Sequence, residues 1–158
     1  MYPKVFLDTT YLLPLFGVDI GLSKAEEAML QKIIDEFYPM INSLSLLEVK
    51  WKILHFSKKN KRILDRYSKV LKFITLTNKF KIVPFYEPAV DELATKLYEL
   101  HNDYIDCSIL AAAITTADVL LTEDSIISNL EKTLKEQKYL FLKEKETFEV
   151  MPISEFKA

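Results

Sequence analysis

Short apolar runs alternate along this chain with longer segments of helical periodicity. The apolar runs predict buried strands at residues 4–7, 39–42 and 119–121, and a strand or extended link at 81–85. Apolar residues three and four positions apart predict helices over residues 24–38, 61–76, 87–101 and 125–137. Residues 139–142 and 148–153 are typical of late strands. Pro84, within the segment 81–85, argues against a central place in the sheet for that segment.

Strands that alternate with helices predict βαβ units and therefore a parallel sheet. Right-handed crossovers place a helix layer on each face of that sheet. We therefore predict the α/β class, as a three-layer α/β/α sandwich with a central parallel sheet of about four or five strands. A chain of 158 residues without repeats, linkers or low-complexity segments is expected to form a single domain over residues 1–158.

The stretch 103–124 predicts a helix, a minimal turn and a buried strand that is followed by an acid. Asp103 can cap the helix, because a short carboxylate at that position accepts an orphan backbone N–H. Asp106 lies inside an otherwise apolar helix, which costs free energy unless a cation or a proton compensates. Asp124 follows the strand, and ligands of open α/β sheets bind at the carboxyl ends of strands.

Two further acids follow predicted strands. Asp8 comes directly after the first strand, as a candidate metal ligand or as a helix cap. Glu48 follows the second strand, but the pattern Ser45-Leu-Leu-Glu48 also fits a capping box. Ser43 or Ser45 is expected to cap that helix.

The spacing of Leu47, Trp51 and Leu54 predicts the apolar face of the same helix, with Trp51 in the core or on a partner surface. His101 lies at the end of a predicted helix, where a protonated ring interacts favourably with the helix dipole. We interpret His101 as a helix-terminal residue rather than a ligand or a catalytic base, and His55 in the same way.

The charge of the chain is unevenly distributed. Residues 50–72 hold nine of the 21 basic residues but only one of the 23 acidic ones. Such a segment suits a polyanionic substrate, although a solvated pair of helices explains it as well. Cys107 has no partner for a disulfide, so a cytoplasmic location is expected, and no run is long enough to span a membrane. One cysteine and two histidines are too few for a standard structural zinc site.

The four acids Asp8, Glu48, Asp106 and Asp124 come from separate segments that can meet at one edge of the sheet. Four carboxylates in one pocket repel one another unless cations or protons are present. Hard divalent cations prefer oxygen ligands, which indicates Mg²⁺ or Mn²⁺. The chemistry that suits such a site is in-line hydrolysis of a phosphodiester. No Ser/His/Asp arrangement is evident, and two glycines are too few for a phosphate-binding loop.

The chain resembles the PIN-domain nucleases over nearly its whole length. The resemblance rests on residues 5–10 (VFLDTT), 43–49 (SLSLLEV), 104–113 (YIDCSILAAA), 117–124 (ADVLLTED) and 150–156 (VMPISEF). It implies a Mg²⁺- or Mn²⁺-dependent endoribonuclease, commonly a homodimer, with many chains of this length acting as VapC-type toxins that a partner antitoxin neutralises. Carried over by position, Asp8, Glu48, Asp106 and Asp124 bind the metal, and Thr122 orients the last carboxylate or a water.

The chain departs from the family pattern after Asp124. Family members often carry a further acid and a phenylalanine there, whereas Ser125-Ile-Ile127 occupies these positions, which weakens the case for a fifth ligand. Asp103 could assist the site, although capping explains it equally well.

The leading hypothesis is a toxin ribonuclease. Two alternatives remain: an RNA-processing nuclease without an antitoxin, and a non-catalytic PIN-like module that binds RNA or a protein. A phosphatase with Asp8 as its nucleophile is disfavoured, because Thr10 occupies the position where that chemistry normally places a second aspartate.

Overall fold

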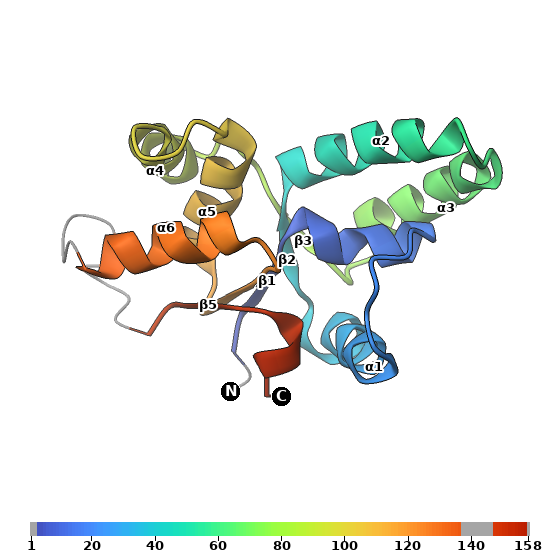
Figure 1. Cartoon of the computed structure of the whole chain (residues 1–158), viewed down its shortest axis with the longest axis horizontal. Helices are drawn as coiled ribbons and strands as arrows, with labels where there is room; N and C mark the ends of the chain where they lie inside the picture. The colour runs from blue at the N-terminus through green and yellow to red at the C-terminus, as the bar shows by residue number, and fades with distance from the viewer. Residues whose placement is uncertain (1–2, 137–146, 158) are drawn as a thin grey trace.

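The structure is a computed structural model that describes residues 3–136 and 147–157 (Figure 1). Its strands are β1 (Val5–Leu7), β2 (Met40–Asn42), β3 (Lys81–Val83), β4 (Val119–Leu121) and β5 (Glu149–Met151). Its α-helices are α1 (Lys24–Lys32), α2 (Ser43–Ser57), α3 (Arg62–Leu76), α4 (Pro88–Tyr98), α5 (Tyr104–Thr116) and α6 (Ser125–Glu136). Tighter or wider helical turns are η1 (Thr9–Phe16), η2 (Ile33–Phe37) and η3 (Ile153–Glu155). The strand predicted at 139–142 lies outside the described residues.

The five strands form one parallel sheet in the order β3-β2-β1-β4-β5. Strand β1 lies at the centre, and Leu7 pairs with Leu121 of β4, so both strands end level with each other. Strand β3 is an edge strand, in agreement with the expectation from Pro84, which directly follows it. The predicted three-layer α/β/α sandwich is confirmed.

Alternate residues of the central strands face two separate cores. Val5 and Leu7 point to the layer formed by η1, α1, η2, α2 and α3, while Phe6 points to α4, α5 and α6. All three side chains are at most 1% exposed. Helix α5 has buried residues all around its central turns and therefore reads as apolar on every side. The sheet is thus covered on both faces, as a parallel sheet requires.

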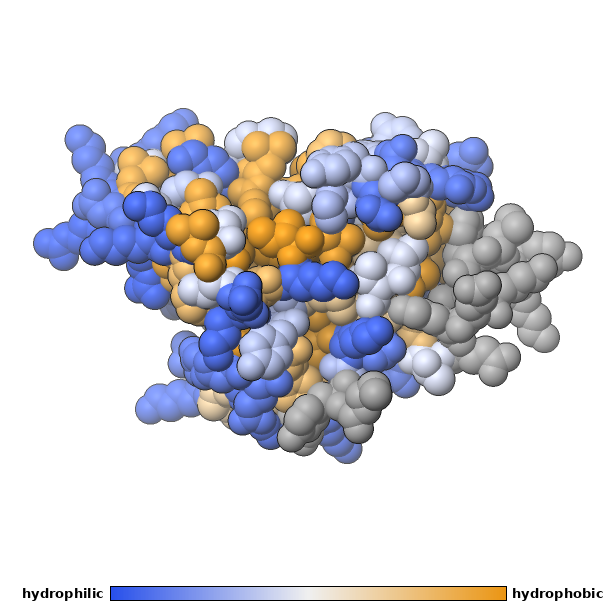
Figure 2. Space-filling view, turned by 180° about the vertical axis from the view of Figure 1, so that it is seen from behind, coloured by the Kyte–Doolittle hydropathy of each residue, from blue (hydrophilic) through white to orange (hydrophobic). Residues whose placement is uncertain are grey.

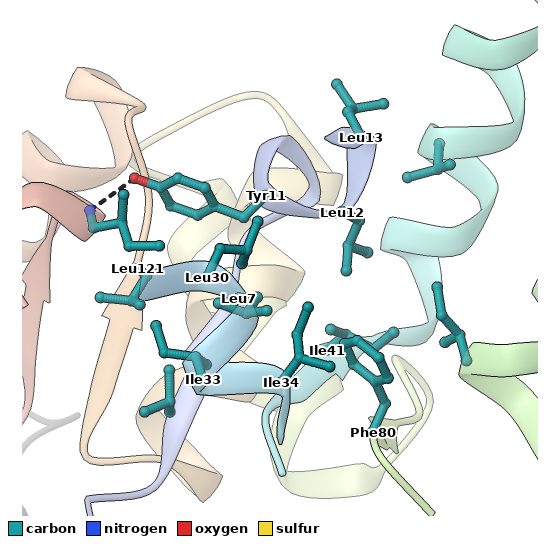
Figure 3. Packing of buried hydrophobic residues seen from close by; sticks show 14 of the residues in the cluster. Leu7, Tyr11, Leu12, Leu13, Leu30, Ile33, Ile34, Ile41, Phe80 and Leu121 are labelled. Carbon is teal, nitrogen blue, oxygen red and sulfur yellow. Dashed lines mark hydrogen bonds between the residues drawn. The ribbon is translucent and has the colours of Figure 1, made fainter. Parts of the chain in front are cut away.

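Tyr11 lies in the first core and is hydrogen-bonded to the C-terminal part of the described chain (Figure 3). Its ring is fully buried among Leu7, Leu12 and Leu30, and its hydroxyl oxygen accepts the backbone N–H of Ile153 at 2.8 Å. The same hydroxyl donates to a carboxylate oxygen of Glu123, one residue before Asp124. Burial, followed by this acceptor, raises the pKa of Tyr11, so the hydroxyl stays protonated and remains a donor.

Helix α2 differs from its predicted form. Its buried face consists of Ser45, Val49 and Ile53, whereas Leu47 and Trp51 are exposed by 44% and 55%. The stripe of Leu47, Trp51 and Leu54 is therefore not the buried face of α2, and Trp51 does not lie in the core. A second apolar stripe, through Val49 and Ile53, packs into the first core instead. The capping box predicted for α1 is present, with Ser23 and Glu26 exchanging side-chain and backbone hydrogen bonds.

Candidate active site at the carboxyl edge of the sheet

Strands β1 and β4 bring Asp8 and Thr122 together, because each residue directly follows its strand. The backbone N–H of Asp8 donates to the carbonyl of Leu121 at 3.0 Å. The Thr122 hydroxyl donates to Oδ2 of Asp8 at 2.9 Å and accepts the backbone N–H of Asp124 at the same distance. Thr122 is buried, and its hydroxyl group holds the carboxylate of Asp8 in place. The same hydroxyl contacts the backbone N–H of Asp124 rather than its carboxylate.

Asp8 is a buried carboxylate without a cationic partner among the contacts of the described residues. It is only 5% exposed, and its Oδ1 accepts the N–H of Thr9 at 2.7 Å, which also caps η1. Burial raises the pKa of Asp8 to about 6, although the hydrogen bonds from Thr122 and Thr9 oppose the shift. The negative charges of Glu48 and Asp106 raise it further. This environment favours either a proton or a bound cation.

Asp106 lies in the first turn of α5 and pairs with a residue that the sequence analysis set aside. Its Oδ2 lies 3.0 Å from Nε2 of His101. The helix-terminal interpretation of His101 is therefore corrected: its ring is directed at a carboxylate of the candidate site. Burial raises the pKa of Asp106 while His101 lowers it, and the charges of Asp103 and Asp124 raise it further. Asp103 itself caps α5 through the N–H of Ile105 at 2.9 Å.

Glu48 does not take part in the capping box that the sequence pattern Ser45-Leu-Leu-Glu48 suggested. Helix α2 begins at Ser43, and its cap is Asn42, whose Oδ1 accepts the N–H of Leu44 at 2.8 Å. The prediction of Ser43 or Ser45 as the cap was wrong, because the helix starts immediately after the strand. Glu48 lies in the second turn, where its carboxylate pairs with Lys52 at 2.7 Å.

Asn42 also ties the second strand to α5. Its Nδ2 donates to the carbonyl and to the hydroxyl of Ser108, each at 3.1 Å, and the side chain is fully buried. These bonds fix the start of α2, and thus Glu48, relative to the helix that carries Asp106.

We predict that Asn42→Ala lowers the free energy of unfolding by about 2–4 kcal/mol, since it removes a helix cap and leaves buried groups unpaired. Urea denaturation measures the change. The matched control is Asn129→Ala, which alters an exposed side chain of α6 and should shift stability by less than about 0.5 kcal/mol. Equal stability of the two variants would show that the Asn42 bonds contribute nothing net.

Asp124 begins α6 and uses one carboxylate oxygen for the helix. Its Oδ1 accepts the N–H of Ile126 at 2.7 Å, which is an N-cap interaction. Among the described residues Oδ2 has no hydrogen-bond partner, and the carboxylate is close enough to Asp106 to raise the pKa of Asp106. Figure 1 shows the starts of η1, α2 and α6 gathered at this edge of the sheet.

The four acids thus form one electrostatic cluster, linked from Glu48 to Asp8, from Asp8 to Asp106 and from Asp106 to Asp124. Within residues 3–136 and 147–157, no three acidic, histidine or cysteine side chains are already arranged as a set of metal ligands. Two of the carboxylates instead have partners within the chain: Glu48 forms an ion pair with Lys52, and Asp106 lies within hydrogen-bond distance of the His101 ring. The oxygen-only donors and the buried charge of Asp8 fit a hard divalent cation.

An α/β/α sandwich with acids gathered near the carboxyl ends of its parallel strands suits the metal-dependent hydrolases as a class. The family model of the PIN domain matches residues 5–133, which is most of the chain. The protein therefore belongs to the PIN domain family, whose members are in general divalent-metal-dependent nucleases. A comparison with curated proteins gives no significant match.

Sequence reasoning missed three residues of this site: Asn42, Lys52 and His101. A signal existed for Lys52, which stands four residues after Glu48, the spacing of an ion pair on a helix. His101 and Asp106 are joined by a non-helical connection, whose path periodicity does not predict.

Among the described residues, no helix is both long and apolar enough to cross a membrane.

Proposed function

We propose that this protein is a divalent-metal-dependent endoribonuclease that hydrolyses RNA phosphodiester bonds, and that it acts as the toxin of a toxin–antitoxin pair. The observation that carries the proposal is the clustering of Glu48, Asp106 and Asp124 near Asp8, a buried carboxylate with no cationic side chain as its partner among the described residues. Membership of the PIN domain family supports the nuclease activity.

The proposed ligands of Mg²⁺ or Mn²⁺ are the four clustered acids. When bound, the metal lowers the pKa of a water ligand and neutralises charge on the attacked phosphate. Thr122 fixes the rotamer of Asp8 through its hydroxyl bond. Lys52 and His101 hold Glu48 and Asp106 at the site, and each pair uses a single carboxylate oxygen, Oε1 of Glu48 and Oδ2 of Asp106. A carboxylate has acceptor sites on both oxygens, so these pairs are compatible with a bound cation.

RNA is the proposed substrate because a strongly basic segment, residues 50–72, begins at the helix that carries Glu48. The toxin role is supported by the resemblance to VapC-type chains. A small upstream gene for a DNA-binding antitoxin would support that role, and its absence would favour RNA processing without an antitoxin.

The proposal predicts metal-dependent cutting of RNA. The purified protein is incubated with a structured RNA and with DNA of the same sequence, in Mn²⁺, in Mg²⁺ or in EDTA. We expect cleavage of the RNA in Mn²⁺ or Mg²⁺, no cleavage in EDTA, and recovery when Mn²⁺ is added back. Cleavage that persists in EDTA would contradict the metal dependence. Preferential cutting of the DNA would contradict the proposed substrate.

A further inference from the structure

Helix α2 carries an apolar face that the fold does not use. Leu47, Trp51 and Leu54 lie at helical spacing and are exposed by 44%, 55% and 44%. The buried face of the helix is supplied by other residues, Val49 and Ile53 among them. A tryptophan and two leucines exposed along one face of a helix have an unfavourable hydration free energy, which indicates a surface for a partner or a substrate.

This face begins at the candidate active site. Trp51 stands three residues after Glu48, which is about 4.5 Å along the helix axis at 1.5 Å per residue. Lys52, on the adjoining side of the helix, pairs with Glu48. Figure 1 shows α2 leading from the carboxyl edge of the sheet out to the turn before α3. Anything bound along α2 therefore reaches from the acids towards that turn.

The far end of the face is cationic. Lys58, Lys59, Lys61 and Arg62 surround the turn between α2 and α3, and all four side chains are exposed. Figure 2 shows this tip, at its left edge, covered by hydrophilic residues. Asp65 is the one acid in residues 50–72. A polyanion complements this charge, whereas an apolar protein partner would not use it.

An aromatic side chain between a cationic tip and a catalytic edge is the arrangement of a single-strand binding surface. Bases stack on exposed aromatic rings while lysines follow the phosphates. Beyond Trp51, the exposed ring of His55 stands four residues further along the helix and so lies on the same side of α2. Lys50 is already placed over the ring of Tyr67, at 4.0 Å, so we assign the phosphate contacts to the exposed cations of the tip.

We infer that the outer face of α2 binds single-stranded RNA, with a base stacked on Trp51 next to the phosphate that is cut and the strand running towards the α2–α3 turn. This inference rests on the proposed ribonuclease function and names the track that delivers its substrate. It makes Trp51 a substrate-binding residue rather than part of the core.

Trp51 is the only tryptophan in the chain, so its fluorescence reports on this face alone. A single-stranded RNA of mixed sequence is titrated in EDTA, where binding is separated from cleavage. We expect quenching of the Trp51 emission, and the same affinity from the polarisation of a labelled RNA. Trp51→Ala should weaken binding by roughly tenfold or more, whereas Trp51→Phe, which keeps a ring, should lose only a few-fold.

Tyr98→Ala is the matched control, because this exposed aromatic residue lies on α4 and should leave binding unchanged. Lys58→Gln combined with Lys59→Gln should make the salt dependence of binding shallower. Circular dichroism and size-exclusion chromatography of each variant establish that fold and oligomeric state are kept.

Unchanged RNA affinity in Trp51→Ala would overturn the inference, and so would the absence of quenching. Dissociation of a dimer by Trp51→Ala, with RNA affinity intact, would assign the face to a second copy of the chain. Loss of binding to an antitoxin, again with RNA affinity intact, would assign it to that protein. Because binding is measured without metal, a failure of cleavage contradicts the proposed function but not the RNA track.

Discussion

Asp106→Asn is expected to reduce RNA cleavage in Mn²⁺ by about a thousandfold, the size of effect seen when a group that stabilises the transition state is removed. Asp106 is placed between the charges of Asp8 and Asp124, so its loss removes the centre of the cluster. Asparagine has the same shape and keeps an acceptor for His101, so the fold should be retained. The measurement is single-turnover cleavage of a labelled RNA.

The control for this experiment is Asp19→Asn, an exposed aspartate whose Oδ1 accepts the N–H of Gly21 and which lies outside the cluster. It should cut as fast as the wild type. Equal cutting by Asp106→Asn would mean that the activity comes from a contaminant or from another site. The shift in melting temperature that Mn²⁺ produces gives a second readout, because a lost ligand reduces that shift whether or not RNA is cut.

Asp8→Asn is expected to stabilise the metal-free protein at neutral pH while abolishing activity. The pKa of Asp8 is about 6 in the folded protein against 3.8 for the free side chain, so the folded state holds the proton more tightly. Its contribution to stability is complete below about pH 3.8 and is lost as the pH rises through 6. Above that pH the charged, buried carboxylate lowers the free energy of unfolding of the wild type by roughly 3 kcal/mol. The Asp8→Asn variant avoids this cost but loses one hydrogen bond, which lowers its own free energy of unfolding by about 1 kcal/mol.

We therefore expect Asp8→Asn to be about 2 kcal/mol more stable than the wild type in EDTA at pH 7, and close to equal or less stable near pH 4. Urea denaturation at both pH values measures the difference. Addition of Mn²⁺ should reverse the order at pH 7, because only the wild type keeps the full ligand set. A variant that is less stable than the wild type in EDTA at pH 7 would contradict the account of Asp8.

The central strands were predictable because their short apolar runs alternate along the chain with longer helical segments, which indicates a parallel sheet. Runs such as Val119–Leu121 are apolar at every position, which a parallel strand buried on both faces requires. The acids were predictable as candidates for the same reason, since Asp8 and Asp124 stand just beyond such strands. Their meeting at one edge then follows from parallel topology.

The details of α2 could not be read from periodicity. The helix carries one apolar stripe through Val49 and Ile53 and another through Leu47 and Trp51, and spacing alone does not say which one meets the sheet. Its cap was equally ambiguous, because Asn42, Ser43 and Ser45 are all good capping residues. The contact between His101 and Asp106 depends on the path of a short connection, which tertiary packing sets.

The hydroxyl of Tyr11 has a consequence for where this folding unit ends. The match to the family stops at residue 133, yet Tyr11 accepts a hydrogen bond from Ile153 and donates one to Glu123, beside Asp124. Strand β5 completes the sheet against β4, and Phe156 is buried in the first core. A protein shortened to the matched segment would expose the edge of β4 and remove the backbone N–H of Ile153 that the buried Tyr11 hydroxyl accepts, leaving only its bond to Glu123. Residues 147–157 therefore complete the sheet and the first core, and the folding unit extends at least to Phe156.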